Sequence, residues 1–231
     1  MNVTVVIPTY NEADNLPRLV EALFALPAED LSILVVDDQS PDGTGGVAER
    51  LAAGSAGRLA VLHRQGERGF GKSYLEGFRA ALAGGAQAVV QMDADLSHPP
   101  GLLPELLAAL KDCDIAVGSR YIPGGGVDQA WPGWRKGLSH FGNFYARSLL
   151  GLAVQDVTGG FRAWRASVLA ELPLERVRSN GYAFQVEMIY LASRLGYTCR
   201  EIPFYFPDRQ FGQSKMSFRV QREAALRVWQ M

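Results

Sequence analysis

Two carboxylates stand at a spacing that suits a divalent cation. Asp93 and Asp95 flank Ala94 directly after the apolar run AVVQM, where a buried strand would pass into a loop. Carboxylates at i and i+2 in such a loop can converge on one ion, and Mg²⁺ takes one or two carboxylates together with phosphate oxygens and water. A Mg²⁺ or Mn²⁺ ion held there would neutralise the diphosphate of a departing nucleoside diphosphate. The structural alternative is an Asp-rich turn in which Asp95 only caps the following helix.

Basic side chains gather in three segments that are far apart in the sequence, Arg64–Lys72, Arg120–Lys136 and Arg209–Arg227. The planar guanidinium of an arginine suits bidentate binding of phosphate, and Arg120 follows a predicted strand directly. The alternative for a lone arginine is a surface ion pair. His98 lies three residues after Asp95 and is either a metal ligand or an incidental polar side chain.

An alternation of strands and helices in the first half would position these side chains. Short, nearly continuously apolar runs predict strands of a parallel sheet that is covered on both faces. These runs are Val3–Pro8, Ser32–Val36, Arg58–His63, Ala86–Met92 and Asp114–Gly118. Helix patterns lie between them at Asn15–Ala25, Gly45–Ala53, Lys72–Ala83 and Leu102–Lys111. The alternation predicts right-handed βαβ units and an α/β fold.

Ligands of such sheets bind just beyond the carboxyl ends of the strands. The segments at those positions are Pro8–Glu12, Asp37–Asp38, Arg64–Lys72, Asp93–Asp95 and Ser119–Arg120, and most of them carry charge pairs or clusters. We therefore expect a polyanionic ligand or a metal at this edge. Lys72 follows Gly69 and Gly71, a weak form of a phosphate-binding loop that opens a helix.

The second half is less regular. A Gly/Pro-rich stretch at 121–133 precedes an apolar helix pattern at Gly137–Leu150, and Asp156–Arg162 reads as a turn. A helix near Ala183–Leu195, a strand near Thr198–Pro203 and a basic loop at 208–215 are expected to follow. No linker is visible, so we expect one domain over 1–231.

The last pattern, Met216–Met231, predicts an amphipathic helix. Its arginines crowd one face, while Trp229 and most apolar residues share the other, with Leu226 misplaced. The segment Gly137–Leu150 offers a second apolar face through Leu138, Phe141, Tyr145 and Leu149. Both helices are candidates for lying in a membrane interface, although core packing is the commoner reason for such a pattern.

Composition excludes several classes of protein. The 231 residues carry a formal net charge of −1, which does not indicate nucleic-acid binding. The two cysteines, Cys113 and Cys199, lack metal-site spacing and are expected to be buried free thiols in a reducing compartment. No secretory signal and no apolar run long enough to span a bilayer is visible, so the expectation is a soluble or peripheral protein. The first strand leads into IPTYNE, not GxGxxG, which argues against a dinucleotide-binding oxidoreductase.

The motifs of nearly the whole chain resemble those of family 2 glycosyltransferases of GT-A fold. The matching segments are VVIPTYNEADNL, VVDDQSPDGT, GFGKSYLEGF, MDADLSHPP, VGSRY, DVTGGFR, GYAFQVEM and DRQFGQSKMS. Within that family, the combination of DADLSHPP, GYAFQ and RxxGxSK is most similar to the dolichyl- or polyprenyl-phosphate mannose synthases. The resemblance implies a GT-A (Rossmann-like), mostly parallel sheet flanked by helices, together with a C-terminal amphipathic interfacial helix.

The resemblance also implies a nucleotide-sugar half at about 1–120, an acceptor and membrane half at about 121–231, and roles for individual residues. The nucleotide would contact Pro8, Tyr10, Glu12, Val36 and Asp38, and we add Lys72 from the helix start. Asp93, Ala94 and Asp95 would contact the diphosphate and the metal, with Ser97 in the place of a third metal ligand, while Arg209 and Lys215 would bind the diphosphate from the far side. Arg120 and Arg135 would bind the acceptor phosphate, and with Asp95 they form the expected catalytic set.

The implied reaction is inverting transfer of mannose from GDP-mannose to a dolichyl or polyprenyl monophosphate, at the cytoplasmic face of a membrane, by a peripheral protein. Either the interfacial helices suffice for membrane contact or a membrane-embedded partner is required. A lipid-phosphate glucosyltransferase that uses UDP-glucose is the nearest alternative. A polysaccharide synthase or an ordinary glycosyltransferase with a hydroxyl acceptor is disfavoured because the QxxRW-type signature is missing. A non-catalytic sugar-nucleotide-binding module remains open.

Overall fold

The computed structural model describes residues 1–28, 30–207 and 225–231. Its main sheet has seven strands in the order β3-β2-β1-β4-β7-β5-β8. The strands are β1 (Val3–Thr9), β2 (Leu31–Asp37), β3 (Leu59–His63), β4 (Ala88–Gln91), β5 (Ile115–Ser119), β7 (Arg162–Arg165) and β8 (Cys199–Pro203). β7 is antiparallel to both of its neighbours, β4 and β5, whereas the other pairs are parallel.

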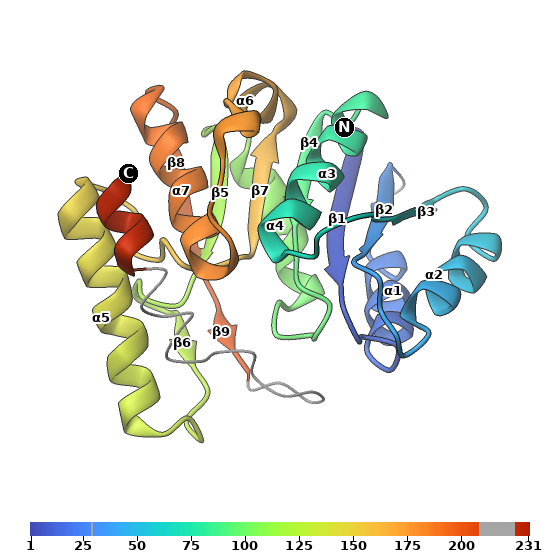
Figure 1. Ribbon diagram of the computed structural model, residues 1–231, viewed down its shortest axis with the longest axis horizontal. Helices are drawn as coiled ribbons and strands as arrows, with labels where there is room; N and C mark the ends of the chain where they lie inside the picture. The colour runs from blue at the N-terminus through green and yellow to red at the C-terminus, as the bar shows by residue number, and fades with distance from the viewer. Residues whose placement is uncertain (29, 208–224) are drawn as a thin grey trace.

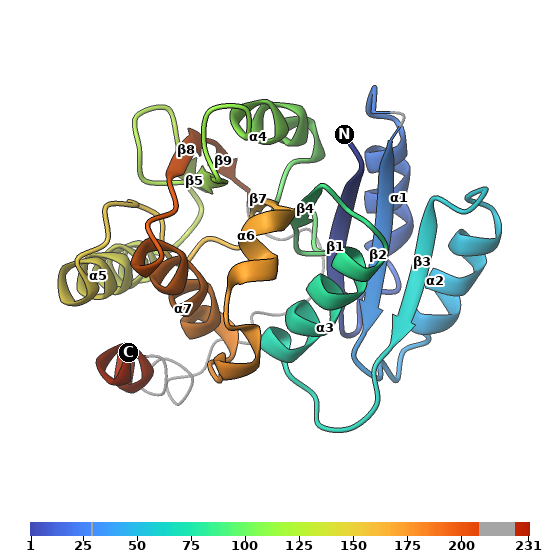
Figure 2. The same cartoon turned by 90° about the horizontal axis from the view of Figure 1, so that it is seen from above.

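Helices cover both faces of this sheet (Figures 1 and 2). They are α1 (Leu16–Phe24), α2 (Thr44–Ala53), α3 (Phe70–Ala83), α4 (Leu103–Ala109), α5 (Gly133–Leu150), α6 (Ala166–Glu171) and α7 (Gly181–Arg194), with short 3₁₀ turns at Pro100–Leu102 and Leu174–Arg176. One apolar core lies between the sheet and α1, α2 and α4, and a second lies between the sheet and α3, α6 and α7. The predicted α/β sheet with helices on both faces is confirmed.

Alternate residues of each strand enter opposite cores, which explains the continuous apolar runs. In β1, Val5 and Ile7 pack into one core and Val6 into the other. The helix α3 approaches the sheet closely at Gly77, where an added Cβ would lie 2.4 Å from Val6 Cγ1. This contact brings the amino end of α3 to the carboxyl ends of β1 and β2.

The strand β7 is an element that the sequence did not predict. It follows the expected turn at once, and its sequence RAWR has neither an apolar run nor a clear alternation. Arg162 is nevertheless fully buried, because its guanidinium donates to the carbonyls of Gln185 and Val157, each at 2.8 Å. Burial lowers the pKa of Arg162 to about 10. The expected acceptor half therefore contributes a strand to the middle of the main sheet.

Helix α5 begins at Gly133, four residues before the predicted start, and ends where Gly151 adopts a left-handed conformation with φ 65°. A small parallel pair, β6 (Gly126–Val127) and β9 (Tyr205–Phe206), lies nearby. The described end of the chain forms a helical turn beside α5 (Figure 1), where the Tyr145 hydroxyl donates to the Ala225 carbonyl at 3.3 Å. Of the predicted helix at 216–231, only this end lies within the described residues.

Neither of the two cysteines forms a disulfide, as expected. Cys113 is buried as expected, whereas Cys199 is only half-buried. Its partial burial still raises the pKa of the Cys199 thiol to about 11. Within the described ranges, no helix has both the length and the apolar character needed to cross a bilayer.

Candidate active site

The loops that follow the strands enclose one cavity of about 530 Å³. Most of the predicted site residues line it, namely Pro8, Tyr10, Glu12, Asp38, Asp93, Ala94, Asp95, Arg120 and Arg135. They come from both halves of the chain and meet because the carboxyl ends of parallel strands share one edge of the sheet. Arg209 and Lys215 lie outside the described residues, so their predicted roles stay predictions.

The carboxylate pair is held by hydrogen bonds within the β4 loop. The Asp95 carboxylate accepts from the backbone N–H of Ser97 at 3.1 Å and from its hydroxyl at 2.5 Å. Asp93 accepts from the Tyr74 hydroxyl at 3.0 Å, and burial raises the pKa of Tyr74, which keeps it a donor. Leu96, between the two bonded residues, has φ 62°, a conformation that closes this tight turn.

The carboxylate oxygens of Asp93 and Asp95 fit a magnesium or manganese ion that takes only one or two ligands from the protein. Across the described ranges, no cluster of three or more His, Cys, Asp or Glu side chains is assembled that could enclose a metal. Asp93 and Asp95 both line the cavity, so they can bind an ion together with phosphate oxygens and water. Ser97 is fully buried and donates its hydroxyl proton to Asp95, so the structure makes it a support of that carboxylate. Its direct metal ligation stays a prediction.

His98 stabilises the same loop. Its Nδ1 accepts the backbone N–H of Asp93 at 3.0 Å, and its ring stacks on Phe161 at 5.0 Å between centroids. Burial lowers the pKa of His98, even though the charges of Asp93 and Asp95 act to raise it. With Nδ1 as the acceptor, the proton of the neutral ring lies on Nε2.

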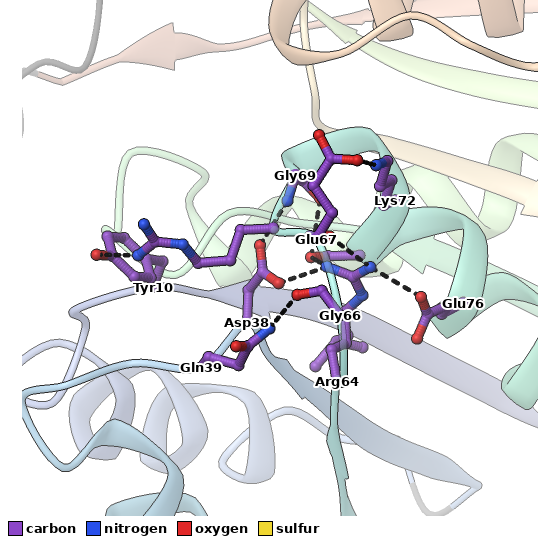
Figure 3. Close-up of polar contacts among 12 residues, drawn as sticks. Tyr10, Asp38, Gln39, Arg64, Gly66, Glu67, Gly69, Lys72 and Glu76 are labelled. Carbon is purple, nitrogen blue, oxygen red and sulfur yellow. Dashed lines mark hydrogen bonds and ion pairs between the residues drawn. The ribbon is translucent and has the colours of Figure 1, made fainter.

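Asp38 lies at the centre of a buried network at the end of β2 (Figure 3). One of its oxygens forms an ion pair with Arg64, and the other accepts the backbone N–H of Gly69 at 2.8 Å. Arg64 reaches on to Glu76 of α3 at 2.8 Å. Through these bonds, Asp38 connects the loop before α3 to the end of β2, and it also lines the cavity. The side chain of Val36 is fully buried in the core between the sheet and α3, away from the cavity lining.

The start of α3 differs from the predicted phosphate-binding loop. The N–H of Gly71 donates to the Asn180 side chain at 2.9 Å, and the N–H of Gly69 is held by Asp38. Lys72 bonds to Glu67 at 2.5 Å (Figure 3) and does not line the cavity. The N–H groups of both glycines are therefore bonded to protein side chains, and these contacts give no support to a phosphate role for Lys72.

Tyr10 and Arg68 both line the cavity and contact each other. The guanidinium carbon of Arg68 lies over the Tyr10 ring, 4.7 Å from its centroid, and Arg68 donates a hydrogen bond to the Tyr10 hydroxyl. A flat group that stacks on Tyr10 would therefore meet a guanidinium as well. Glu12 accepts from Asn15 at 2.8 Å, and its own N–H donates to Thr44 at 2.9 Å. Arg68 lies in the basic segment recognised in the sequence, but no spacing rule singled it out.

The basic wall of the cavity is formed by Arg120 and Arg135. The Nε and Nη2 atoms of Arg120 each donate to the Asp156 carboxylate at 2.7 Å, and Nη2 also donates to Thr158 at 3.0 Å. Burial alone would raise the pKa of Asp156, but the charge and hydrogen bonds of Arg120 bring it below the usual range. Arg135 lies over the ring of Trp131 at 3.6 Å. Asp156 and Thr158 thus orient Arg120 through Nε and Nη2, while Trp131 orients Arg135, and the two cationic groups suit the binding of a phosphate.

Several further residues line the cavity that the sequence had not assigned, notably Thr158, Gly160, Asn180, Tyr182 and Gln185. Thr158 and Gly160 belong to the segment DVTGGFR, and Tyr182 and Gln185 belong to GYAFQVEM; both segments carried the resemblance without individual roles. Asn180 directly precedes the second segment. The antiparallel β7 and the start of α7 bring them to the site. That placement depends on strand order, which no local pattern encodes.

Comparison with known proteins agrees with this geometry. Residues 4–172 match the glycosyl transferase family 2. The undecaprenyl-phosphate mannosyltransferase of Micrococcus luteus is 44% identical over 99% of this chain and 93% of its own length. The polyprenol monophosphomannose synthase of Mycolicibacterium smegmatis is 46% identical, over 97% and 84%. A glucosyl-3-phosphoglycerate synthase of Mycobacterium tuberculosis, solved with Mg²⁺ and UDP, gives a TM-score of 0.69 at 18% identity, over 99% of this chain and 78% of that one.

The fold and the cavity define a GT-A glycosyltransferase. The chain belongs to glycosyl transferase family 2, because the family match covers most of its length and the curated relatives match nearly all of it. The predicted family resemblance is confirmed.

Proposed function

We propose that this enzyme transfers mannose from GDP-mannose to a polyprenyl or dolichyl monophosphate, with inversion at the anomeric carbon. The observation that carries the proposal is that one cavity joins the carboxylates Asp93 and Asp95 to the fixed guanidinium groups of Arg120 and Arg135. A metal-bound diphosphate fits the first pair and a second phosphate fits the other. The two mannosyltransferase relatives, which are 44% and 46% identical, support mannose as the sugar and a lipid phosphate as the acceptor.

The chemistry requires little proton transfer. A lipid monophosphate has a second pKa of about 6, so near pH 7 it already carries a nucleophilic oxygen. That oxygen forms a bond to the anomeric carbon of α-mannose, while the bond from this carbon to the β-phosphate oxygen breaks and its electron pair leaves with GDP. A bound Mg²⁺ or Mn²⁺ would supply charge stabilisation to the leaving diphosphate. No general base is required, unlike transfer to a sugar hydroxyl.

The protein would contribute mainly by positioning. Asp93 and Asp95 hold the diphosphate end of the donor, supported by Tyr74 and Ser97. Arg120 is oriented by its bidentate pair with Asp156, which directs the guanidinium while offsetting its buried charge. Two phosphates placed on one line through the sugar carbon convert a bimolecular encounter into an oriented displacement.

We also propose a peripheral position on the cytoplasmic side of a membrane, and the outer face of α5 supports the membrane contact. Trp134, Phe141 and Phe144 are 70%, 62% and 64% exposed, and Leu149 is exposed beside them. The helix contains no Asp or Glu. Exposed aromatic residues on a basic helix are typical of segments that lie in the interface of an anionic bilayer. Of the predicted face, Phe141 and Leu149 point outward, whereas Leu138 and Tyr145 are half-buried.

Sugar transfer to a defined polyprenyl phosphate in detergent, with Mg²⁺ or Mn²⁺, tests the reaction by comparing GDP-mannose with UDP-glucose. Metal-dependent mannosyl transfer is expected. Glucosyl transfer from UDP-glucose would instead identify the nearest alternative and refute the donor assignment. Binding of a donor without any transfer would favour a non-catalytic sugar-nucleotide module.

Co-sedimentation with vesicles that contain phosphatidylglycerol tests the membrane face. The triple variant Trp134→Ser, Phe141→Ser, Phe144→Ser should lose binding, whereas Leu195→Ser, which alters an exposed apolar residue after α7, should not. If the wild-type protein fails to bind protein-free vesicles, a membrane-embedded partner is required. Equal binding by the triple variant and the wild type would contradict a role for α5.

A further inference from the structure

A chain of buried side-chain hydrogen bonds crosses the sheet and ends at the cavity. The indole N–H of Trp164 in β7 donates to Oε1 of Gln91 at 3.2 Å. The amide Nε2 of Gln91 then donates to Oε1 of Gln185 at 2.7 Å. Trp164, Gln91 and Gln185 are each at least 98% buried, and Gln185 lines the cavity.

The first member of this chain fixes the orientation of the others. An indole nitrogen can only donate, so Gln91 must present its oxygen to Trp164 and its NH₂ group to Gln185. Rotating the amide of Gln185 would place two NH₂ groups 2.7 Å apart. The amide of Gln185 therefore keeps its oxygen toward Gln91 and its Nε2 on the other side.

That Nε2 has no hydrogen-bond partner within the described part of the chain. It borders a space that exists because residue 160 is glycine. A Cβ at Gly160 would lie 3.1 Å from Gln185 Nε2, 3.4 Å from His98 Cε1 and 3.7 Å from Asp93 Oδ1. A buried donor without a partner is unfavourable by about 1–3 kcal/mol, so the position calls for an acceptor supplied by a ligand or by water.

We propose that Gln185 Nε2 donates a hydrogen bond to a hydroxyl of the donor sugar and that Gln185 selects the sugar. This inference rests on the proposed function, because it takes a nucleotide-sugar as the ligand. The space adjoins Asp93, so a group placed there is next to the diphosphate end of the donor. Gln185 and Gly160, which border the space, carry no charge. An uncharged amide donor suits a neutral hydroxyl, whereas a phosphate favours charged donors.

The main test compares affinities for GDP-mannose and for GDP in the presence of Mn²⁺ and the absence of acceptor. Gln185→Leu removes the donor group and keeps a similar volume. We expect affinity for GDP-mannose to fall about tenfold, equivalent to the roughly 1.4 kcal/mol of one neutral hydrogen bond, with affinity for GDP unchanged. The matched control is Gln87→Leu, an exposed glutamine at the other end of β4, which should change neither affinity.

GDP-mannose analogues that each lack one hydroxyl identify the partner. In wild type, removal of one particular hydroxyl should weaken binding about tenfold, and in Gln185→Leu the same removal should have no further effect. Additive losses for every hydroxyl would overturn the proposal, as would an equal loss of affinity for GDP. Retained affinity in Gln185→Leu would mean that Nε2 bonds only to water, and it would overturn the proposal too.

A second variant guards against misfolding of the first. Gln185→Glu keeps the bond from Gln91 and offers an acceptor to which a sugar hydroxyl can still donate, so it should bind GDP-mannose better than Gln185→Leu does. Weaker binding than in Gln185→Leu would indicate a phosphate oxygen and contradict the proposal. If the wild type binds UDP-glucose and not GDP-mannose, the donor assignment fails, but the same comparison with UDP-glucose and UDP still tests Gln185.

Discussion

The substitution Asp156→Asn should strongly destabilise the enzyme. The Asp156 carboxylate is fully buried and accepts three hydrogen bonds from Arg120, one from the backbone N–H at 3.0 Å and two from the guanidinium at 2.7 Å. An asparagine keeps the shape but removes the charge and one acceptor oxygen. It would leave the buried guanidinium of Arg120 without its counter-ion, so the cost is that of an uncompensated buried charge.

Breaking a buried pair of this kind costs about 3–5 kcal/mol. That is a large part of a typical unfolding free energy of roughly 5–15 kcal/mol. For a chain of about this size, 1 kcal/mol corresponds to roughly 2–4 °C in melting temperature, so Asp156→Asn should melt roughly 6–20 °C below wild type.

Equilibrium unfolding in urea measures this directly. Asp112→Asn is the control, because its pair with Arg200 at 3.5 Å is exposed and should contribute less than about 1 kcal/mol. The double variant Arg120→Met, Asp156→Asn should recover part of the loss, since no buried charge is left unpaired. A loss of less than about 1 kcal/mol in Asp156→Asn would show that the Arg120–Asp156 pair is not desolvated and would contradict its burial as a charged pair.

The same pair predicts a dependence on pH. The pKa of Asp156 is lower in the folded protein than the ordinary value of 3.8, so its contribution is fully present above that value and is lost as pH falls through the folded pKa. Asp156→Asn should therefore lose less stability in acid than wild type does. Urea titrations between pH 7 and pH 3 would show this, and parallel losses in the two proteins would contradict it.

Two further predictions concern packing and thiol reactivity. Gly77→Ala should destabilise the protein by about 1–3 kcal/mol because the added Cβ would collide with Val6. Gly142→Ala in α5, where the added Cβ meets open space, should stabilise the protein by about 0.5–1 kcal/mol. Urea unfolding of both variants would check the two signs. Cys199, whose pKa is raised to about 11, should react with iodoacetamide at pH 8 about 100-fold more slowly than an ordinary thiol, and mass spectrometry of the timed reaction would reveal rapid labelling if the burial is wrong.

Much of the fold was accessible from the sequence because the first half encodes it locally. Each apolar run between Val3 and Gly118 became a strand, and each intervening pattern became a helix within a few residues. Because ligands of such sheets bind beyond the carboxyl ends of the strands, the sequence also predicted that Tyr10, Asp38, Asp95 and Arg120 would share one site, and they line one cavity.

The parts that were not predicted depend on contacts between distant segments. β7 reads as a polar turn because Arg162 and Arg165 flank its centre, whereas the burial of Arg162 depends on hydrogen bonds to the carbonyls of Gln185 and Val157. Similarly, nothing in the spacing of the sequence indicates that Asn180 occupies the amide of Gly71, where a phosphate had been expected. The feature that the sequence predicted least well was therefore which groups bond to each buried charge and backbone amide.

The substitution Asp95→Ala tests whether the Asp93–Asp95 pair binds the metal and the diphosphate during transfer to a lipid phosphate. Transfer of labelled mannose from GDP-mannose to polyprenyl phosphate should be measured at saturating Mn²⁺, with Asp112→Asn as the matched loss of a carboxylate elsewhere. We expect wild type and Asp112→Asn to turn over equally and Asp95→Ala to show no turnover above background, while unfolding in urea confirms that it is folded. Turnover by folded Asp95→Ala at a rate near that of wild type would show that the Asp95 carboxylate is not needed to bind the metal and the diphosphate.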